Sequence, residues 1–442
     1  MCLNHLPLGF PELSDSGRTR FERPLSWKIN RMRRFLLLVT LTVATALPAL
    51  VLRLTGLQIS PIGATAAFGV AILSAGFLLS WGAEAAERHV SQGLIIAAVA
   101  LVTVLPEYAV DLYYAFQAGK AGPGSQYVHY AAANMTGANR LLVGLGWPLL
   151  VLLHWARGGG RTVELSSSNT IEIAFLLVAS LYAFVIVLKD SISVVDFVVL
   201  VAVFGMYVWR VHGAPEGSKE DKDEDEEPGP AAALNGLPIR TQWSIMAGLT
   251  AVACVIILAS AEPFAEAMVS SGRLLGLNEF LLIQWLAPLA SEAPAVTLAV
   301  LFVFAGRAAN GLGALISDKI NQWTLLVGML PLALSIGAGS VAALPLDARQ
   351  AEEFFLTSGQ SLFALALLLR MRLSLSSALV LMGLFSIQIA LAFIYRNDEA
   401  QTILSLTALA WIYIVLAAIL FLVQRRRLFE ISHFILKGNQ HP

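Results

Sequence analysis

Charged residues are scarce in this sequence. Asp, Glu, Lys and Arg together account for 13% of its 442 residues, whereas soluble domains carry about 25%. The formal net charge is only −1, so no bulk electrostatic argument supports binding to nucleic acid. The two cysteines, Cys2 and Cys254, lie far apart and indicate neither a disulfide framework nor a metal site. The seven histidines form no cluster with the spacing of metal ligands.

Apolar residues, by contrast, make up 57% of the chain. Between residues 35 and 423, apolar runs of roughly 20 residues recur, and each is long enough as a helix to cross about 30 Å of hydrocarbon. We therefore predict an all-α polytopic membrane protein with twelve spans, at residues 35–56, 64–87, 94–117, 127–155, 170–188, 192–211, 242–270, 278–305, 311–340, 353–371, 374–395 and 401–423.

The distribution of basic residues predicts the orientation of these spans. If the N-terminus is cytoplasmic and the spans alternate, most lysines and arginines lie on the cytoplasmic side, as the positive-inside rule requires. The opposite side then holds only Arg53, Lys120, Lys189, Arg273, Arg349 and Arg396. This count predicts an integral protein of the inner cell membrane with both termini in the cytoplasm. The first apolar run begins too late for an ordinary signal peptide, which favours a signal-anchor helix.

One sizeable polar loop interrupts the apolar spans, between residues 213 and 240. It contains the acidic stretch "EGSKEDKDEDEEPGP" and few hydrophobic residues. Such a composition predicts a solvated cytoplasmic linker. A regulatory cation sensor is the alternative, but the stretch lacks the glycine turn and the spaced ligands of a calcium loop.

The sequence contains an internal repeat. "LVTVLPEYAV" (101–110) aligns with "LAPLASEAPAV" (286–296), and each is followed by a span with polar residues at its centre. Each copy comprises five spans, and an odd number of spans per copy makes the two copies inverted, an architecture of secondary transporters. The predicted organisation is an N-terminal segment with one extra span, a first repeat, the acidic loop, a second repeat, and a last span with a basic tail, at residues 1–63, 64–211, 212–241, 242–395 and 396–442.

The first copy carries acidic residues within its apolar span. Thr103, Glu107 and Asp111 recur at every fourth residue and share one helix face. Pro106 is expected to kink the helix and free carbonyl oxygens. A carboxylate with free carbonyls forms a hard oxygen site that suits Na⁺ or Ca²⁺. Asp111 lies nearer the end of the span and is expected to meet water.

Glu292 occupies the corresponding place in the second copy. Gln284, Pro288 and Glu292 repeat the spacing of every fourth residue, and Pro288 and Pro294 are expected to interrupt the helix. Inverted copies bring Glu107 and Glu292 together near the middle of the membrane. Two carboxylates in one site can bind a divalent cation, and without it their repulsion favours uptake of a proton. The alternative for each glutamate is a structural ion pair.

The polar spans that follow supply neutral oxygens. Asn134 and Asn139 flank Gly137, which permits close helix packing. In the second copy the candidates are Ser317, Asp318, Asn321 and Thr324. Hydrogen bonds between helices are the alternative role for these side chains.

Two basic residues, Arg140 and Lys319, fall inside these spans. We expect each to snorkel or to pair with an acid. A basic side chain that faced the ion site would repel Ca²⁺, or would stand in for a bound cation.

These motifs resemble the calcium/cation antiporter superfamily, which includes the sodium/calcium exchangers. Its first motif, Gly-Thr-Ser-x-Pro-Glu, is matched here by Thr103, Pro106 and Glu107, and its Gly-Asn-x-x-Gly-Ser-Asn motif by Asn134, Gly137 and Asn139. The second repeat keeps Glu292 alone. The resemblance implies ten core helices in two inverted halves, with paired glutamates that bind Ca²⁺ or Na⁺.

The sequence therefore predicts a secondary cation antiporter that works by alternating access and exchanges Ca²⁺ or another cation for Na⁺ or H⁺. The predicted ion ligands are Glu107, Glu292, Thr103, Asn134, Asn139, Ser317, Asp318 and Asn321. No enzymatic activity, soluble cofactor or nucleic-acid partner is expected; a monomer in the bilayer suffices. A passive cation channel and a non-transporting membrane scaffold or sensor remain the alternatives.

Overall fold

The structure is a computed structural model that describes residues 25–86, 105–122, 124–166, 169–213, 229–276 and 279–427. Within these ranges, ten helices are long and apolar enough to cross a membrane. The all-α membrane fold is confirmed, and the predicted count of twelve spans is approximate. Residues 94–104 of the third predicted span, including Thr103, lie outside the described ranges.

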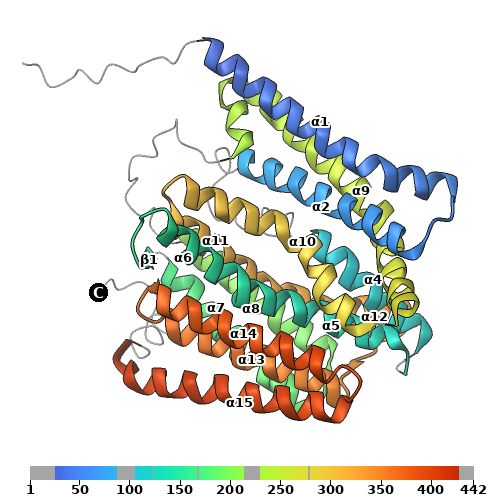
Figure 1. The fold of residues 1–442 in the computed structure, drawn as a ribbon, viewed down its shortest axis with the longest axis vertical. Coiled ribbons are helices and arrows are strands. Elements are labelled where there is room, and N and C mark those ends of the chain that lie inside the picture. Colours follow the sequence, from blue (N-terminus) through green and yellow to red (C-terminus); the bar gives the residue numbers. More distant parts are fainter. Residues whose placement is uncertain are drawn as a thin grey trace, which may run out of the picture.

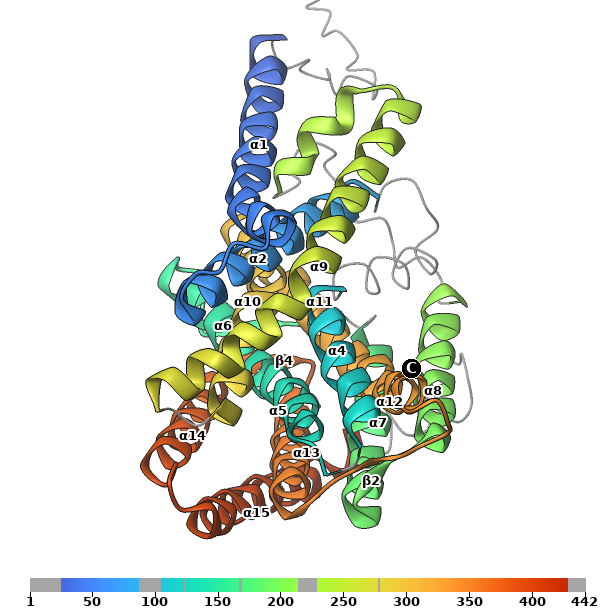
Figure 2. The same cartoon turned by 90° about the vertical axis from the view of Figure 1, so that its right-hand side faces the viewer.

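Within the described residues, each repeat contributes six α-helices. The first repeat comprises α2 (Pro61–Ala86), α4 (Leu105–Ala121), α5 (Gln126–Leu141), α6 (Trp147–Ala156), α7 (Thr170–Lys189) and α8 (Val194–Gly213). The second comprises α9 (Ile239–Leu275), α10 (Glu279–Phe304), α11 (Ala308–Asn321), α12 (Val327–Ala338), α13 (Ala348–Leu368) and α14 (Leu375–Ile394). The extra helices are α1 (Leu25–Thr55) and α15 (Glu399–Val423). They lie at opposite edges of the bundle (Figures 1 and 2).

Helices of one repeat pack against helices of the other in a reciprocal pattern. The helix α2 packs along α9, and α7 packs on α13. The helix α4 packs on the polar span of the second repeat, at α12, and α10 packs on the polar span of the first, mainly at α5. Two short antiparallel ribbons follow the same rule: β1 (Thr162–Glu164) pairs with β4 (Arg372–Ser374), and β2 (Ser191–Ile192) pairs with β3 (Leu344–Pro345). Each ribbon joins one repeat to the other. This reciprocal packing is what a pseudo-twofold axis in the membrane plane produces.

Both polar helices are interrupted by a π-helical segment near their middle. The segment η1 (Leu142–Gly146) separates α5 from α6, and η4 (Gln322–Leu326) separates α11 from α12. Such single π-turns are found frequently at functional sites. The helix α10 instead continues through Pro288 and Pro294, so the predicted interruption by these prolines is wrong.

The described end of the acidic loop is not solvated. The 3₁₀ helix η3 (Pro230–Gly236) packs between α1 and α2. Ala231 and Leu234 are buried there, because these small apolar side chains fill the space between the two helices. The acidic stretch itself falls almost entirely on residues outside the described ranges.

The helices α5 and α10 approach each other closely at Gly137. Pro288 lacks the N–H that would bond the Gln284 carbonyl one turn earlier in α10. Gly137 packs against that same carbonyl, and a Cβ at Gly137 would lie 1.9 Å from its oxygen. The predicted role of Gly137 in close helix packing is confirmed.

Gly137→Ala is therefore expected to lower the unfolding temperature, because the added methyl group meets backbone that cannot move without displacing α10. Overpacking of this kind costs about 1–3 kcal/mol. Thermal unfolding in detergent measures the effect. The matched control is Gly383→Ala on α14, where a Cβ meets no atom within 4 Å. Equal unfolding temperatures for the two variants would contradict the close approach.

Candidate cation site

The centre of the bundle holds the two predicted glutamates. Glu107, in the first turn of α4, is 1% exposed, and Glu292, on α10, is 4% exposed. Gln322 donates its amide Nε2 to both, at 3.3 Å from Glu107 Oε2 and 2.8 Å from Glu292 Oε1. Residues 185 positions apart thus meet on one amide, as the inverted repeat predicts.

Asp111 extends this acidic centre. It is fully buried, so the expectation that it meets water is wrong: α4 continues to Ala121, which leaves Asp111 well inside the helix. Its Oδ1 accepts a hydrogen bond from Asn134 Nδ2 at 2.9 Å. Its Oδ2 and the Oδ1 of Asn134 are buried and have no hydrogen-bond partner within the described chain. Oxygens in this state can accept a ligand.

The remaining predicted ligands lie around the pair in varied states. Asn321 Oδ1 accepts from the Tyr108 hydroxyl at 2.9 Å. Ser317 donates to the Gly313 carbonyl at 3.2 Å and lies 3.3 Å from the Tyr207 hydroxyl. Asp318 is half-buried. All three lie on α11, whose last residue, Asn321, directly precedes Gln322.

Asn139 does not present free oxygens. Lys319 donates its ammonium to Asn139 Oδ1 at 2.7 Å and to the Asn139 backbone carbonyl at 2.9 Å. Both residues are fully buried. The expectation that Lys319 would snorkel or pair with an acid is therefore wrong, because the crossing of α5 and α11 offers it amide oxygens first.

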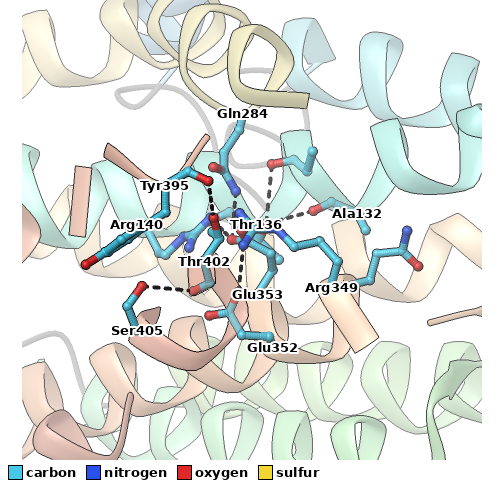
Figure 3. Close-up of polar contacts among 12 residues, drawn as sticks. Ala132, Thr136, Arg140, Gln284, Arg349, Glu352, Glu353, Tyr395, Thr402 and Ser405 are labelled. Carbon is cyan, nitrogen blue, oxygen red and sulfur yellow. Dashed lines mark hydrogen bonds and ion pairs between the residues drawn. The ribbon is translucent and has the colours of Figure 1, made fainter. Parts of the chain in front are cut away.

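Arg140, in contrast, pairs with an acid as expected. It forms a fully buried ion pair with Glu353 of α13, and its guanidinium also lies over the Trp285 ring, 5.4 Å from the centroid. Glu353 accepts in addition from Gln284 at 2.7 Å and pairs with Arg349 at 2.5 Å. Figure 3 shows these side chains converging from α5, α10 and α13. The charge of Arg140 is thereby neutralised instead of opposing a cation.

Two important residues were absent from the sequence-based candidates. Gln322 follows Asp318 by four residues, so the same helical spacing that selected the other ligands could have found it. Glu353 could have been found from the demand of Arg140 for an acid.

Inverted repeats, irregular helices and carboxylates buried at the bundle centre together define a secondary transporter. Residues 59–212 match the family described as sodium/calcium exchanger protein. A solved structure of the H⁺/Ca²⁺ exchanger CAX is 38% identical, with a TM-score of 0.83 over 93% of this chain and 98% of that chain. The comparison with curated proteins gives no match.

Two further solved structures match at lower identity, and the first of them shares the fold. The Ca²⁺/H⁺ antiporter protein YfkE is 14% identical, with a TM-score of 0.52 over 80% of this chain and 99% of its own. The sodium-calcium exchanger NCX_Mj is 19% identical, with a TM-score of 0.49 over 75% and 97% of the two chains.

This chain belongs to the calcium/cation antiporter superfamily. It is an integral membrane protein of a family that transports inorganic cations by antiport.

Proposed function

We propose that this protein exchanges Ca²⁺ for H⁺ by alternating access, with Glu107 and Glu292 as the shared binding site. The observation that carries the proposal is the convergence of the two glutamates on Gln322. Glu107 Oε1 is buried there without a hydrogen-bond partner in the described chain. A carboxylate held in a membrane without a compensating charge costs at least about 2.5 kcal/mol, so a transported cation is a physical reason for its retention.

The donor set suits Ca²⁺. Carboxylate, carbonyl and amide oxygens are its usual ligands, six to eight in number. Within the described residues no group of three or more His, Cys, Asp or Glu side chains is arranged to hold a metal ion. Neutral oxygens must therefore complete the coordination of an ion bound between the glutamates. Our proposed neutral contributors are Asn134, Asn321 and Ser317, with Thr103 from the segment before α4; Asp318 stays a proposed ligand from the sequence.

A proton is the counter-ion that the paired carboxyl groups favour. Without a divalent cation, two adjacent carboxylates repel each other and can relieve the repulsion by sharing one proton. Binding of Ca²⁺ would displace that proton. The H⁺/Ca²⁺ exchanger at 38% identity supports the same pair of ions.

The proposal includes the orientation derived from the basic residues. Both termini and the acidic stretch in 212–241 lie on the cytoplasmic side of the cell membrane. The repeats at 64–211 and 242–395 carry the transport pathway. Protease accessibility of tags at each terminus, in sealed inside-out vesicles, tests this orientation.

The purified protein in sealed liposomes provides the test of function. We expect a proton gradient to drive accumulation of Ca²⁺, and an equal gradient of Na⁺ or K⁺ to have little effect. Collapse of the proton gradient with an ionophore should release the accumulated Ca²⁺. Accumulation driven only by Na⁺ would replace H⁺ by Na⁺ in the proposal. Equilibration of Ca²⁺ without any gradient of a counter-ion would indicate a passive channel instead.

A further inference from the structure

Lys319 occupies an unusual place beside the proposed ion site. Its side chain is fully buried, in the last turn of α11, three residues before Gln322. Its Nζ atom donates to two oxygens of a single residue, the side-chain amide and the backbone carbonyl of Asn139. A buried basic residue at this depth calls for a functional explanation.

The side chain of Lys319 lies among groups that accept hydrogen bonds or attract a cation. Both of its hydrogen-bond partners are acceptors, and its Nζ lies 5.2 Å from the centroid of the Trp323 ring, the geometry of a cation–π contact. No carboxylate within the described ranges forms an ion pair with it. Lys319 thus brings a basic group to the turn of α11 that precedes Gln322.

The oxygens that hold Lys319 are the kind that hold Na⁺. Backbone carbonyl and amide oxygens coordinate hard monovalent cations in transporter sites built from irregular helices. The π-segment η1 begins three residues after Asn139, so the backbone beside this carbonyl is irregular. An ammonium at 2.7 Å and 2.9 Å from the two oxygens excludes a second cation from them.

We propose that Lys319 is a tethered cation that fills a monovalent-ion subsite formed by Asn139, and that it thereby makes the protein insensitive to Na⁺. The inference rests on the proposed cation exchange and adds the residue that selects against one counter-ion. It assigns Asn139 to a latent Na⁺ subsite. Lys319 determines specificity between ions. Ca²⁺ binds at the two glutamates while Lys319 stays on Asn139.

The test compares three proteins: wild type, Lys319→Ala, and the double variant Lys319→Ala with Asn139→Ala. The first measurement is the unfolding temperature in detergent as NaCl replaces choline chloride at constant ionic strength. Na⁺ that binds the folded state raises this temperature. We expect no Na⁺-specific rise for wild type, a clear rise for Lys319→Ala, and its loss in the double variant.

The second measurement is Ca²⁺ uptake into liposomes with and without Na⁺. Uptake by wild type should be unaffected, whereas Na⁺ should alter uptake by Lys319→Ala at least about 5-fold, the lower end of coupling between two ligand sites. A Na⁺ response in wild type would overturn the inference. So would a folded Lys319→Ala protein without any response, or a response that survives in the double variant.

Methylammonium distinguishes a vacated cation site from simple damage. It carries the same charged group as the lysine side chain and should restore both the unfolding temperature and the Na⁺ insensitivity of Lys319→Ala. If Lys319→Ala does not fold in choline chloride, addition of Na⁺ or methylammonium should restore its folding. Failure of both cations to restore it would overturn the inference. Na⁺ binding by Lys319→Ala in a protein that moves no Ca²⁺ would instead reject only the proposed function.

Discussion

Glu107→Gln is expected to lower Ca²⁺ uptake by more than about 100-fold, because even the loss of a supporting group around a metal costs about 10–100-fold in affinity or activity. Glutamine preserves the shape of the side chain and a contact with Gln322, but it removes the charge that a divalent cation requires. Glu292→Gln should have an effect of the same order, since both glutamates contact the same Gln322 amide. Isotopic Ca²⁺ uptake under a proton gradient measures both variants.

Glu262→Gln is the matched control for this experiment. Glu262 lies on α9, where it pairs with Arg53 at 2.7 Å, and both side chains are 47% exposed. Exposed ion pairs contribute about 0–1 kcal/mol, so this variant should fold and transport as wild type does. The unfolding temperature of Glu107→Gln should not fall below that of wild type, because one buried charge has been removed. Normal uptake by Glu107→Gln would reject its role as an ion ligand.

Glu353→Leu is expected to destabilise the protein by about 3–5 kcal/mol, the usual cost of leaving one member of a buried pair without its partner. Arg140 would then have no ion-pair partner within the described chain, whereas Arg349 would keep Glu352 at 3.4 Å. Arg140→Met should cost less, because Glu353 would retain Arg349 and the amide of Gln284. Denaturant unfolding in detergent micelles measures the two free energies.

The double variant Arg140→Met with Glu353→Leu provides the decisive comparison. Replacement of a whole buried pair by apolar side chains is often neutral or stabilising, by about 1–4 kcal/mol. We therefore expect the double variant to be more stable than Glu353→Leu alone, which a double-mutant cycle reports as a favourable coupling energy. Additive effects of the two substitutions would show that the pair does not contribute as a unit.

The acidic centre was predictable because a carboxylate within an apolar helix is costly and therefore conspicuous. The inverted repeat then predicted that Glu107 and Glu292 would meet. Asn134 and Asn321 were selected by the same spacing, and the structure shows them bonded to Asp111 and Tyr108. Whether these residues bind the transported ion remains a prediction that the uptake experiments test.

The partners of the basic residues were harder to predict, because they lie on helices that are far apart in the sequence and meet only in the fold. The Lys319 ammonium could have paired with an acid, and only the crossing of α5 and α11 brings Asn139 to it across 180 positions. Glu353 was overlooked for a different reason. The predicted span began at Glu353, at the membrane border, whereas α13 begins at Ala348 with a capping box from Asp347 and Gln350. The helix therefore begins five residues earlier than the predicted span, and Glu353 lies buried inside the bundle instead of at its border.

The two β-ribbons have a mechanical consequence. The pairing of β1 with β4 and of β2 with β3 fastens α7 to α13 at both of their ends. Helices joined at both ends cannot slide past each other, so α7 and α13 form a rigid pair. No ribbon within the described residues fastens α2 to α9, although these helices pack along each other. We therefore expect α2 and α9 to slide together relative to this rigid pair. This motion would open the buried carboxyl groups to one side of the bilayer or the other.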